Sequence, residues 1–180
     1  MQMKDAAAHW DSVFETKGSD EVSWFQAEPA TSLRLLERWA SPEGSVIDIG
    51  AGASTLVDCL LKAGWEDVTL LDVSGAALTK VRDRLGGRAD GVTFVAADVR
   101  SWQPDRTYDA WHDRAVFHFL VEPADSDRYV AMATQTRRSH LVAWLCSQPS
   151  PPMGQPNARA CRQLATTPTN LCAPSVRPSP

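Results

Sequence analysis

The stretch Val46-Ile-Asp-Ile-Gly-Ala-Gly-Ala-Ser54 decides the fold of this chain. A short apolar and β-branched run, Ser45 to Ile49, predicts a buried strand, and a glycine-rich turn follows it directly. Glycine at a strand-to-helix turn lets the backbone approach a ligand closely, because a Cβ atom there would clash. The stretch therefore predicts a ligand-binding turn formed by Gly50, Ala51 and Gly52.

On both sides of this turn, the sequence alternates between predicted strands and predicted helices. Strands are expected over residues 45–49, 68–71, 92–96 and 108–112, and helices over 5–16, 33–39, 54–63, 74–85 and 116–133. The strands recur about every 20–25 residues and are largely apolar, which is typical of a parallel sheet covered on both faces. The predicted fold class is therefore α/β, a doubly wound, mostly parallel sheet. Its ligand site should lie at the carboxyl ends of the strands.

Acidic residues lie at or just after the ends of three successive predicted strands. Asp48 precedes the first glycine by two residues, Asp72 closes the second strand, and Asp98 follows the third. Asp48 suits an ammonium group, Asp72 can accept from ribose hydroxyls, and Asp98 can accept from an adenine amino group. Val99 is expected to pack on the adenine ring, and Val73 is predicted as a further cofactor contact. Each acid alone is equally typical of a helix cap, but three at successive strand ends favour a cofactor site.

Here the chain resembles the class I, Rossmann-like methyltransferases that use S-adenosylmethionine. Its Val46–Ser54 stretch is similar to their glycine motif, with Ser54 where a third glycine is usual. The resemblance covers residues 9 to about 133. Within it, His9–Phe14 and Trp111–Leu120 are similar to a bacterial subgroup broadly like the thiopurine and elongation-factor-lysine methyltransferases. The resemblance implies that S-adenosylmethionine is the cofactor. It also implies that the segment before the first strand folds over the cofactor, and that the segment after the fourth strand faces the acceptor.

The residues that leave the fourth predicted strand are the candidates for acceptor chemistry. Asp113 is predicted to orient or deprotonate an amine, Arg114 to hold an anionic acceptor, and His112 to line the cofactor pocket. A base is needed only when the nucleophile arrives protonated. In the alternative interpretation, Asp113 and Arg114 form a surface ion pair and His112 is a packing residue. The expected acceptor is a small molecule, with a protein lysine as the second choice.

A nicotinamide-dependent oxidoreductase is the rival enzyme class, since its cofactor site also begins with a strand and a glycine turn. Its fingerprint has glycine or alanine three residues after Gly52, where this chain has Thr55. Asp48 would also repel a pyrophosphate. An acid at Asp72 is common to both classes and does not separate them. The sequence favours the methyltransferase and leaves the oxidoreductase as a lesser alternative.

Composition and charge argue against several other classes of protein. The formal net charge is −4, whereas dedicated nucleic-acid binders carry a basic face. No apolar run approaches the ~18 residues of a membrane span, and the polar start of the chain is unlike a signal peptide. The four cysteines and four histidines lack the paired spacing of a metal site. We therefore expect a cytoplasmic protein with no metal, no nucleic-acid partner and no membrane partner.

The composition changes sharply in the last third of the chain. All 22 acidic residues lie at or before Asp127, and eight of the twelve prolines lie at or after Pro149. Prolines at this density prevent a regular helix or a central strand. We therefore predict a methyltransferase domain over residues 1–135, consisting of N-terminal helices (1–42) and a core (43–135).

Residues 136–180 are predicted to form a poorly ordered, acid-free tail rich in Pro, Ser and Arg, with one strand at 139–145. An out-of-frame translation is the alternative origin, because shifted readings of the codons for 134–140 and 153–161 permit strings typical of this family. Sheets of this family ordinarily contain three more strands, so we expect one that is incomplete after the fourth or fifth strand. Weak or absent catalysis is then expected. The non-enzyme alternative is an inactive cofactor-binding half-domain, either truncated or frameshifted.

Overall fold

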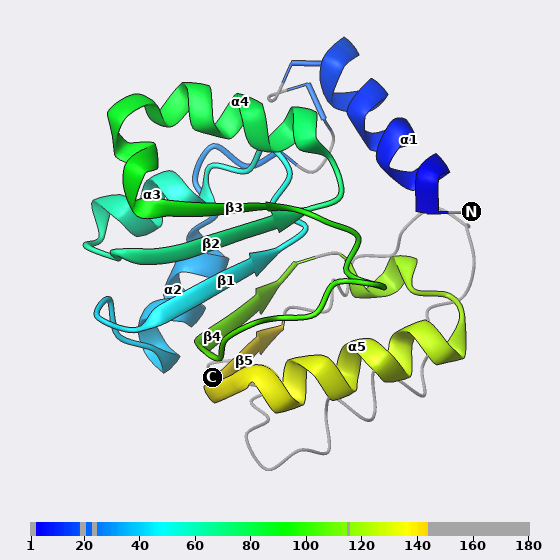
Figure 1. Ribbon diagram of the computed structural model, residues 1–180. Helices are drawn as coiled ribbons and strands as arrows, with labels where there is room; N and C mark the ends of the chain where they lie inside the picture. The colour runs from blue at the N-terminus through cyan, green and yellow to red at the C-terminus, as the bar shows by residue number, and fades with distance from the viewer. Residues whose placement is uncertain (1–2, 19–20, 23–24, 115, 144–180) are drawn as a thin grey trace, which may run out of the picture.

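The computed structural model describes residues 3–18, 21–22, 25–114 and 116–143, with residues 3–5 and 137–143 described by their backbone. Within this part of the chain, five parallel strands form one sheet. The strands are β1 (Ser45–Ile49), β2 (Asp67–Asp72), β3 (Val92–Ala96), β4 (Tyr108–Asp113) and β5 (Arg137–Ala143). Their order across the sheet is β3-β2-β1-β4-β5 (Figure 1).

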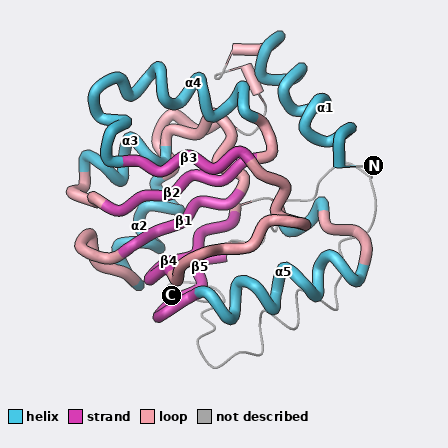
Figure 2. Tube along the Cα trace, viewed as in Figure 1, coloured by secondary structure: helices cyan, strands magenta, loops and turns pink. Residues whose placement is uncertain are grey.

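Helices cover both faces of this sheet. They are α1 (Met3–Thr16), α2 (Ala30–Trp39), α3 (Leu56–Lys62), α4 (Gly75–Leu85) and α5 (Pro123–Thr136), with the short 3-10 helices η1 (Gly86–Gly91) and η2 (Phe117–Phe119). On one face, α2, α3 and α4 pack through a core that contains Leu36, Leu60 and Val81. On the other face, α5 packs through Tyr129 and Met132. Figure 2 shows the helices around the strands, and the predicted doubly wound α/β fold is confirmed.

Strand β1 lies at the centre of the sheet and is buried along its whole length. Successive side chains of a strand point to opposite faces, so Val46 joins the core under α2 and α3 while Ile47 joins the core under α5. A strand that is covered on both faces needs apolar residues at consecutive positions. Among these apolar residues, Asp48 is a buried carboxylate, and such a residue requires partners.

The chain reverses its direction of winding at β1. It first runs outward through β2 to β3, and then returns to the other side of β1 to form β4 and β5. Because the strands are parallel, their carboxyl ends share one edge, toward which the arrows of Figure 1 point. Open α/β sheets bind ligands at this edge, beside the point of reversal. Helix α1 lies beyond this edge and packs beside α4.

Most element bounds agree closely with those predicted from the sequence. The predicted strands 45–49 and 92–96 have the bounds of β1 and β3, and β2 and β4 are slightly longer than expected. The strand expected at 139–145 is β5, which begins two residues earlier and pairs with β4. The sheet therefore continues beyond the predicted domain boundary at 135. Residues 144 and 145, like the rest of the predicted tail, lie outside the described residues.

The helix predicted over 116–133 is wrong in its first part. This part forms η2, and α5 begins only at Pro123. Proline is favoured in the first turn of a helix, where its missing N–H needs no partner, and it disfavours helical backbone in the residue before it. Phe117 and Leu120 are instead buried in the same core as Tyr129. Phe117 and Leu120 are three positions apart, as on one face of a helix, but they pack on the sheet from a short irregular segment.

Candidate functional site

The glycine turn follows β1 and is held against the end of β2. The backbone N–H groups of Gly50 and Ala51 both donate to the Leu71 carbonyl, at 2.8 and 3.1 Å. Gly50 and Gly52 have φ values of 66° and 53°, in the left-handed region that side chains disfavour. This backbone conformation explains the glycines at both positions, and it gives the turn a fixed shape at the carboxyl edge of the sheet.

The space around the turn also requires glycine. A Cβ atom on Gly50 would lie 2.0 Å from Cγ2 of Val116, which follows β4. A Cβ atom on Gly52 would lie 3.2 Å from Cζ of Phe14 in α1 and 3.9 Å from Oδ2 of Asp72. The turn is therefore enclosed by the N-terminal helix on one side and by the segment after β4 on the other.

Asp72 ends β2 directly beside this turn. Its Oδ2 accepts from the Gly52 N–H and its Oδ1 accepts from the Ser74 N–H, both at 2.7 Å. Burial raises the pKa of Asp72 to about 6, against the lowering effect of these two N–H donors, and the charges of Asp48 and Asp11 raise it further. Each carboxylate oxygen has a second lone pair. The residue can therefore bind the turn and still accept from ligand hydroxyls.

Asp48 and His112 meet on neighbouring strands, and both are buried. Nδ1 of His112 lies 2.7 Å from Asp48 Oδ1, and its Nε2 lies 3.0 Å from the hydroxyl oxygen of Ser32 in α2. In the neutral ring, Nδ1–H donates to the carboxylate and Nε2 accepts from the serine hydroxyl. Sequence reasoning selected Asp48 and His112 but missed Ser32, which is one polar residue among many in that segment.

Asp98 follows β3 and is engaged by a residue that sequence reasoning missed. Nε of Arg100 donates to both Asp98 oxygens at 2.9 and 3.0 Å, and its Nη2 donates at 2.5 Å. Although burial raises the pKa of Asp98, the hydrogen bonds from Arg100 hold it below the ordinary value. Val99 is buried in the core beneath α5, and Val73 is half-buried after β2. An adenine group near Asp98 would therefore share the carboxylate with Arg100.

Asp113 is buried at the end of β4 and is held by protein groups. Its Oδ2 accepts from the Tyr129 hydroxyl at 2.5 Å, and its Oδ1 accepts from the Val116 N–H at 2.9 Å. The Tyr129 oxygen in turn accepts from Nε1 of Trp111 at 3.0 Å. Burial raises the pKa of Asp113 above its ordinary value. Because Asp113 is only 3% exposed, the alternative of a surface pair with Arg114 is wrong.

Arg114, the second residue predicted to act on the acceptor, points toward the segment before α2. Its Nη1 donates to the side-chain oxygen of Gln26 at 2.6 Å. It is half-buried, whereas its neighbour Asp113 is fully buried. The two candidates for acceptor chemistry therefore lie in different environments.

Helix α1 brings further residues to the site. Phe14 is buried against Ala53 and Ala77, and Trp10 packs beside it with ring centroids 6.3 Å apart. Trp10 also makes an edge contact with Phe119 of η2, at 5.7 Å. The motif His9–Phe14 contains these aromatic residues, so the resemblance gave a signal for them. The part of the chain before β1 therefore reaches across the glycine turn to the part after β4.

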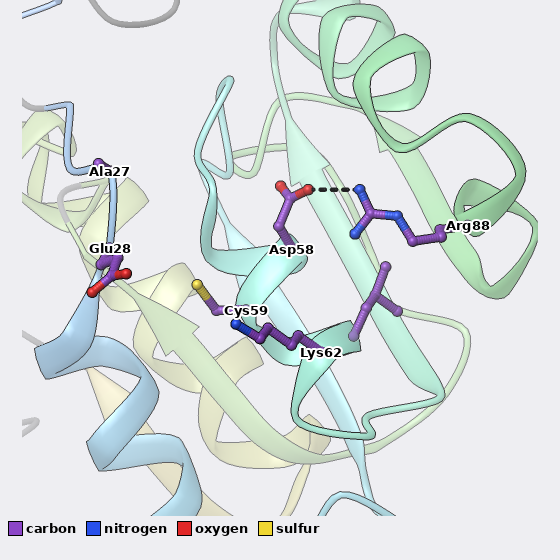
Figure 3. Close-up of a pocket in the computed structure, with 7 residues that line it drawn as sticks. Ala27, Glu28, Asp58, Cys59, Lys62 and Arg88 are labelled. Carbon is purple, nitrogen blue, oxygen red and sulfur yellow. Dashed lines mark hydrogen bonds and ion pairs between the residues drawn. The ribbon is translucent and has the colours of Figure 1, made fainter.

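A separate hollow lies on the surface along α3, as Figure 3 shows. It is lined by Ala27, Glu28, Asp58, Cys59, Leu61, Lys62 and Arg88. Asp58 accepts there from Nη2 of Arg88 at 3.2 Å. None of the predicted site residues lines this hollow.

Over the described ranges, no three potential metal ligands gather, and no helix combines the length and apolarity needed to cross a bilayer.

This region of the chain matches a known protein family. A family model described as "Methyltransferase domain" matches residues 46–138, which is just over half of the chain. The matched segment begins in β1 and runs to the start of β5, so it contains the glycine turn and every strand-end acid described above.

Relatives of known activity cover parts of the chain. The mouse (Mus musculus) eEF1A lysine and N-terminal methyltransferase is 26% identical over 120 residues, covering 64% of this chain and 17% of the relative. Malonyl-[acyl-carrier protein] O-methyltransferase 2 of Ilyobacter polytropus is 24% identical over 105 residues, covering 58% of this chain and 40% of the relative. The chain thus spans less than half the length of either relative.

A solved structure supports the same fold. Phosphoethanolamine N-methyltransferase 1 of Haemonchus contortus, in complex with phosphoethanolamine and S-adenosylhomocysteine, superposes with a TM-score of 0.64 at 16% identity. The match covers 82% of this chain and 33% of the other. This chain therefore shares its fold with a protein whose structure contains S-adenosylhomocysteine.

Proposed function

The chain belongs to the methyltransferase-domain family, and we propose on this premise that it transfers the methyl group of S-adenosylmethionine to an acceptor at the carboxyl edge of its sheet. The prediction of a class I methyltransferase with S-adenosylmethionine as cofactor is confirmed at the level of family and fold. The observation that carries the proposal is the contact between the glycine turn, through the Gly52 N–H, and Asp72, which we propose as the ribose-binding acid.

The residues at this edge fit an adenosyl ligand. The two glycines with positive φ contribute no side chains of their own to the turn, and Asp72 lies beside Gly52. Asp48 lies one strand away, with its orientation fixed by His112. The Asp48 carboxylate favours a cationic ligand over a pyrophosphate, since its charge would repel a pyrophosphate. The site therefore suits the methyltransferase cofactor better than a nicotinamide dinucleotide.

The strand-end residues would hold the cofactor at different points. Asp72 would accept from the ribose hydroxyls, and Asp48 would supply negative charge toward the ammonium group. Asp98 would accept from the adenine amino group beside Arg100, while Val73 and Val99 would form apolar contacts. Gly50, Ala51 and Gly52 would form the floor of the site. When bound, S-adenosylmethionine supplies an electrophilic methyl group, and the protein contributes alignment of the two reactants.

The acceptor would approach from the segment after β4. A small molecule is our first proposal and a protein lysine the second, and the relatives support both classes because their names include a small amine and a protein lysine as acceptors. Arg114, which donates to Gln26, would bind an anionic acceptor group. The burial of Asp113 supports a positioning role, in which it orients the segment through the Val116 N–H. We propose a cytoplasmic location, with no nucleic-acid or membrane partner.

The experiment that tests this function is a pair of calorimetric titrations of the full chain, one with S-adenosylhomocysteine and one with NAD. We expect saturable binding of S-adenosylhomocysteine and none of NAD. Tighter binding of NAD would favour the oxidoreductase. A methylation assay with labelled S-adenosylmethionine then separates an active enzyme from a cofactor-binding domain without turnover.

A further inference from the structure

We infer that Asp11 is a positioning residue for Asp72, which it holds in place through Ser74 once helix α1 has docked. This inference rests on the proposed function, because it assigns Asp11 a role in the same cofactor site. Asp11 lies in α1, outside the family-matched segment, and 61 positions before Asp72. The contact that joins them passes through a single buried serine.

The carboxylate of Asp11 binds the start of α4. Its Oδ1 accepts from the Ser74 hydroxyl at 2.6 Å and from the Ala76 N–H at 3.1 Å. A carboxylate at the N-terminus of a helix is stabilised by the unpaired N–H groups and by the helix dipole. Asp11 therefore fastens α1 to the first turn of α4.

Ser74 connects the two carboxylates and is completely buried. Its hydroxyl donates to Asp11 and accepts from the Ala77 N–H at 3.0 Å, so it also caps α4. Its backbone N–H donates to Asp72 Oδ1 at 2.7 Å. Since both ends of Ser74 are bonded, a change in its position moves the group that orients Asp72. A chain of hydrogen bonds therefore runs from Asp11 through Ser74 and Asp72 to the Gly52 N–H.

Two further contacts fix α1 over the same place. Phe14 packs against the open side of Gly52 and the buried Ala77, and the Lys80 ammonium donates to the Lys17 carbonyl at 2.9 Å just beyond α1. Figure 1 shows α1 beside the beginning of α4, at the edge where the strands end. Docking of α1 therefore completes both the wall of the cofactor site and the support of its ribose-binding acid.

The charges around Asp72 give this inference a specific signature. Asp48 from β1 and Asp11 from α1 are the charged groups that act on it, and both raise its pKa. Neutralising Asp11 should therefore lower the pKa of Asp72. An acid of α1 that does not act on Asp72, such as Glu15, would not change the pH at which the cofactor binds.

The test is calorimetric titration of the full chain with S-adenosylhomocysteine, for the wild type and for Asp11→Ala and Asp11→Asn, between pH 5 and 8. The Asp11→Ala variant should bind about tenfold more weakly at pH 8, because Ser74 loses its partner. Asn keeps an acceptor oxygen for Ser74, so Asp11→Asn should bind with nearly wild-type affinity at pH 8. Its pH midpoint for binding should move to lower pH.

Glu15 provides the matched control, because it is an exposed acid one turn further along α1. Glu15→Ala and Glu15→Gln should bind with wild-type affinity and midpoint. The inference is overturned if Asp11→Ala binds as tightly as Glu15→Ala, or if Asp11→Asn keeps the wild-type midpoint. If Asp11→Ala does not fold, the midpoint of Asp11→Asn decides. If the wild type itself does not bind S-adenosylhomocysteine, the proposed function fails instead.

Discussion

Asp48 and His112, which are 64 residues apart in the chain, form a buried pair with Asp48 Oδ1 2.7 Å from Nδ1 of His112. The pair joins the central strand β1 to β4, and Ser32 extends it to α2. The carboxylate at the head of the glycine motif thus has a partner within the protein. It serves the stability of the sheet as well as the proposed binding of an ammonium group.

Replacing His112 should therefore destabilise the fold strongly. His112→Leu leaves the Asp48 carboxylate buried without its ring partner, and such a loss costs about 3 kcal/mol of unfolding free energy. Ser32→Ala removes only the second contact of the ring and should cost about 1 kcal/mol. Urea unfolding of the two variants compares these values. Equal losses of unfolding free energy in the two variants would show that the Asp48–His112 contact stabilises the fold no more than the Ser32 contact does.

Replacing Gly50 should be more harmful than replacing a glycine with free space around it. Gly50→Ala combines a positive φ with a Cβ atom 2.0 Å from Val116 Cγ2. Gly64 also has a positive φ, at 90°, but a Cβ there meets nothing within 4 Å. We expect Gly64→Ala to cost about 1–2 kcal/mol and Gly50→Ala clearly more.

The double variant Gly50→Ala, Val116→Ala separates the two causes of the stability loss in Gly50→Ala, which are backbone strain and the clash with Val116. Removing Cγ2 of Val116 should recover part of the lost unfolding free energy, while the backbone strain remains. Urea unfolding of the single and double variants measures this coupling. Purely additive losses would contradict the packing of Val116 against the turn.

Binding of S-adenosylhomocysteine should weaken at acidic pH. In the proposed site, ribose hydroxyls would donate to the ionised carboxylate of Asp72, whose pKa burial raises to about 6. Above this pH the carboxylate is charged and affinity should be constant, and below it a proton competes with the ligand. Each further pH unit should then cost about tenfold in Kd. Titrations from pH 5 to 8 measure this, and a Kd that stays constant down to pH 5 would contradict it.

Tyr129→Phe should destabilise the segment after β4. The change removes the hydroxyl that donates to Asp113 and accepts from Trp111, leaving two buried polar groups without this partner. A loss of about 2 kcal/mol in unfolding free energy is expected. In a double-mutant cycle, Asp113→Ala and Tyr129→Phe should be less than additive, because each change alone removes the hydrogen bond between the two side chains. Additive losses would show that the two residues act independently.

The parts of the fold that depend on local sequence could be predicted well. The apolar run before Gly50 predicts a strand, and the apolar spacing within 74–85 predicts a helix; β1 and α4 are found where they were expected. Parallel strands must share an edge, so Asp48 and Asp72 could be assigned to one site. The first part of the helix predicted over 116–133 was wrong, because Phe117 and Leu120, which are buried in a short irregular segment, have the spacing of a helix.

The partners of the acids could not be predicted. Asp113 is held by Tyr129 from α5, and Ser74 by Asp11 from α1, so each contact depends on how whole elements pack. Residue type alone did not distinguish Asp113 as a buried acid from a surface acid. The pair Asp98–Arg100 is an exception, because Arg100 follows Asp98 by only two positions. A search for opposite charges close to Asp98 in the sequence would have found it.

The most direct test of the account is calorimetry with S-adenosylhomocysteine on the wild type, Asp72→Ala and the control Asp67→Ala. Asp67 lies at the other end of β2 and pairs with Arg106 at the surface. We predict wild-type affinity for Asp67→Ala and a loss of about 1.5–3 kcal/mol for Asp72→Ala. Equal affinities of the wild type and Asp72→Ala would contradict the assignment of this edge of the sheet as the cofactor site.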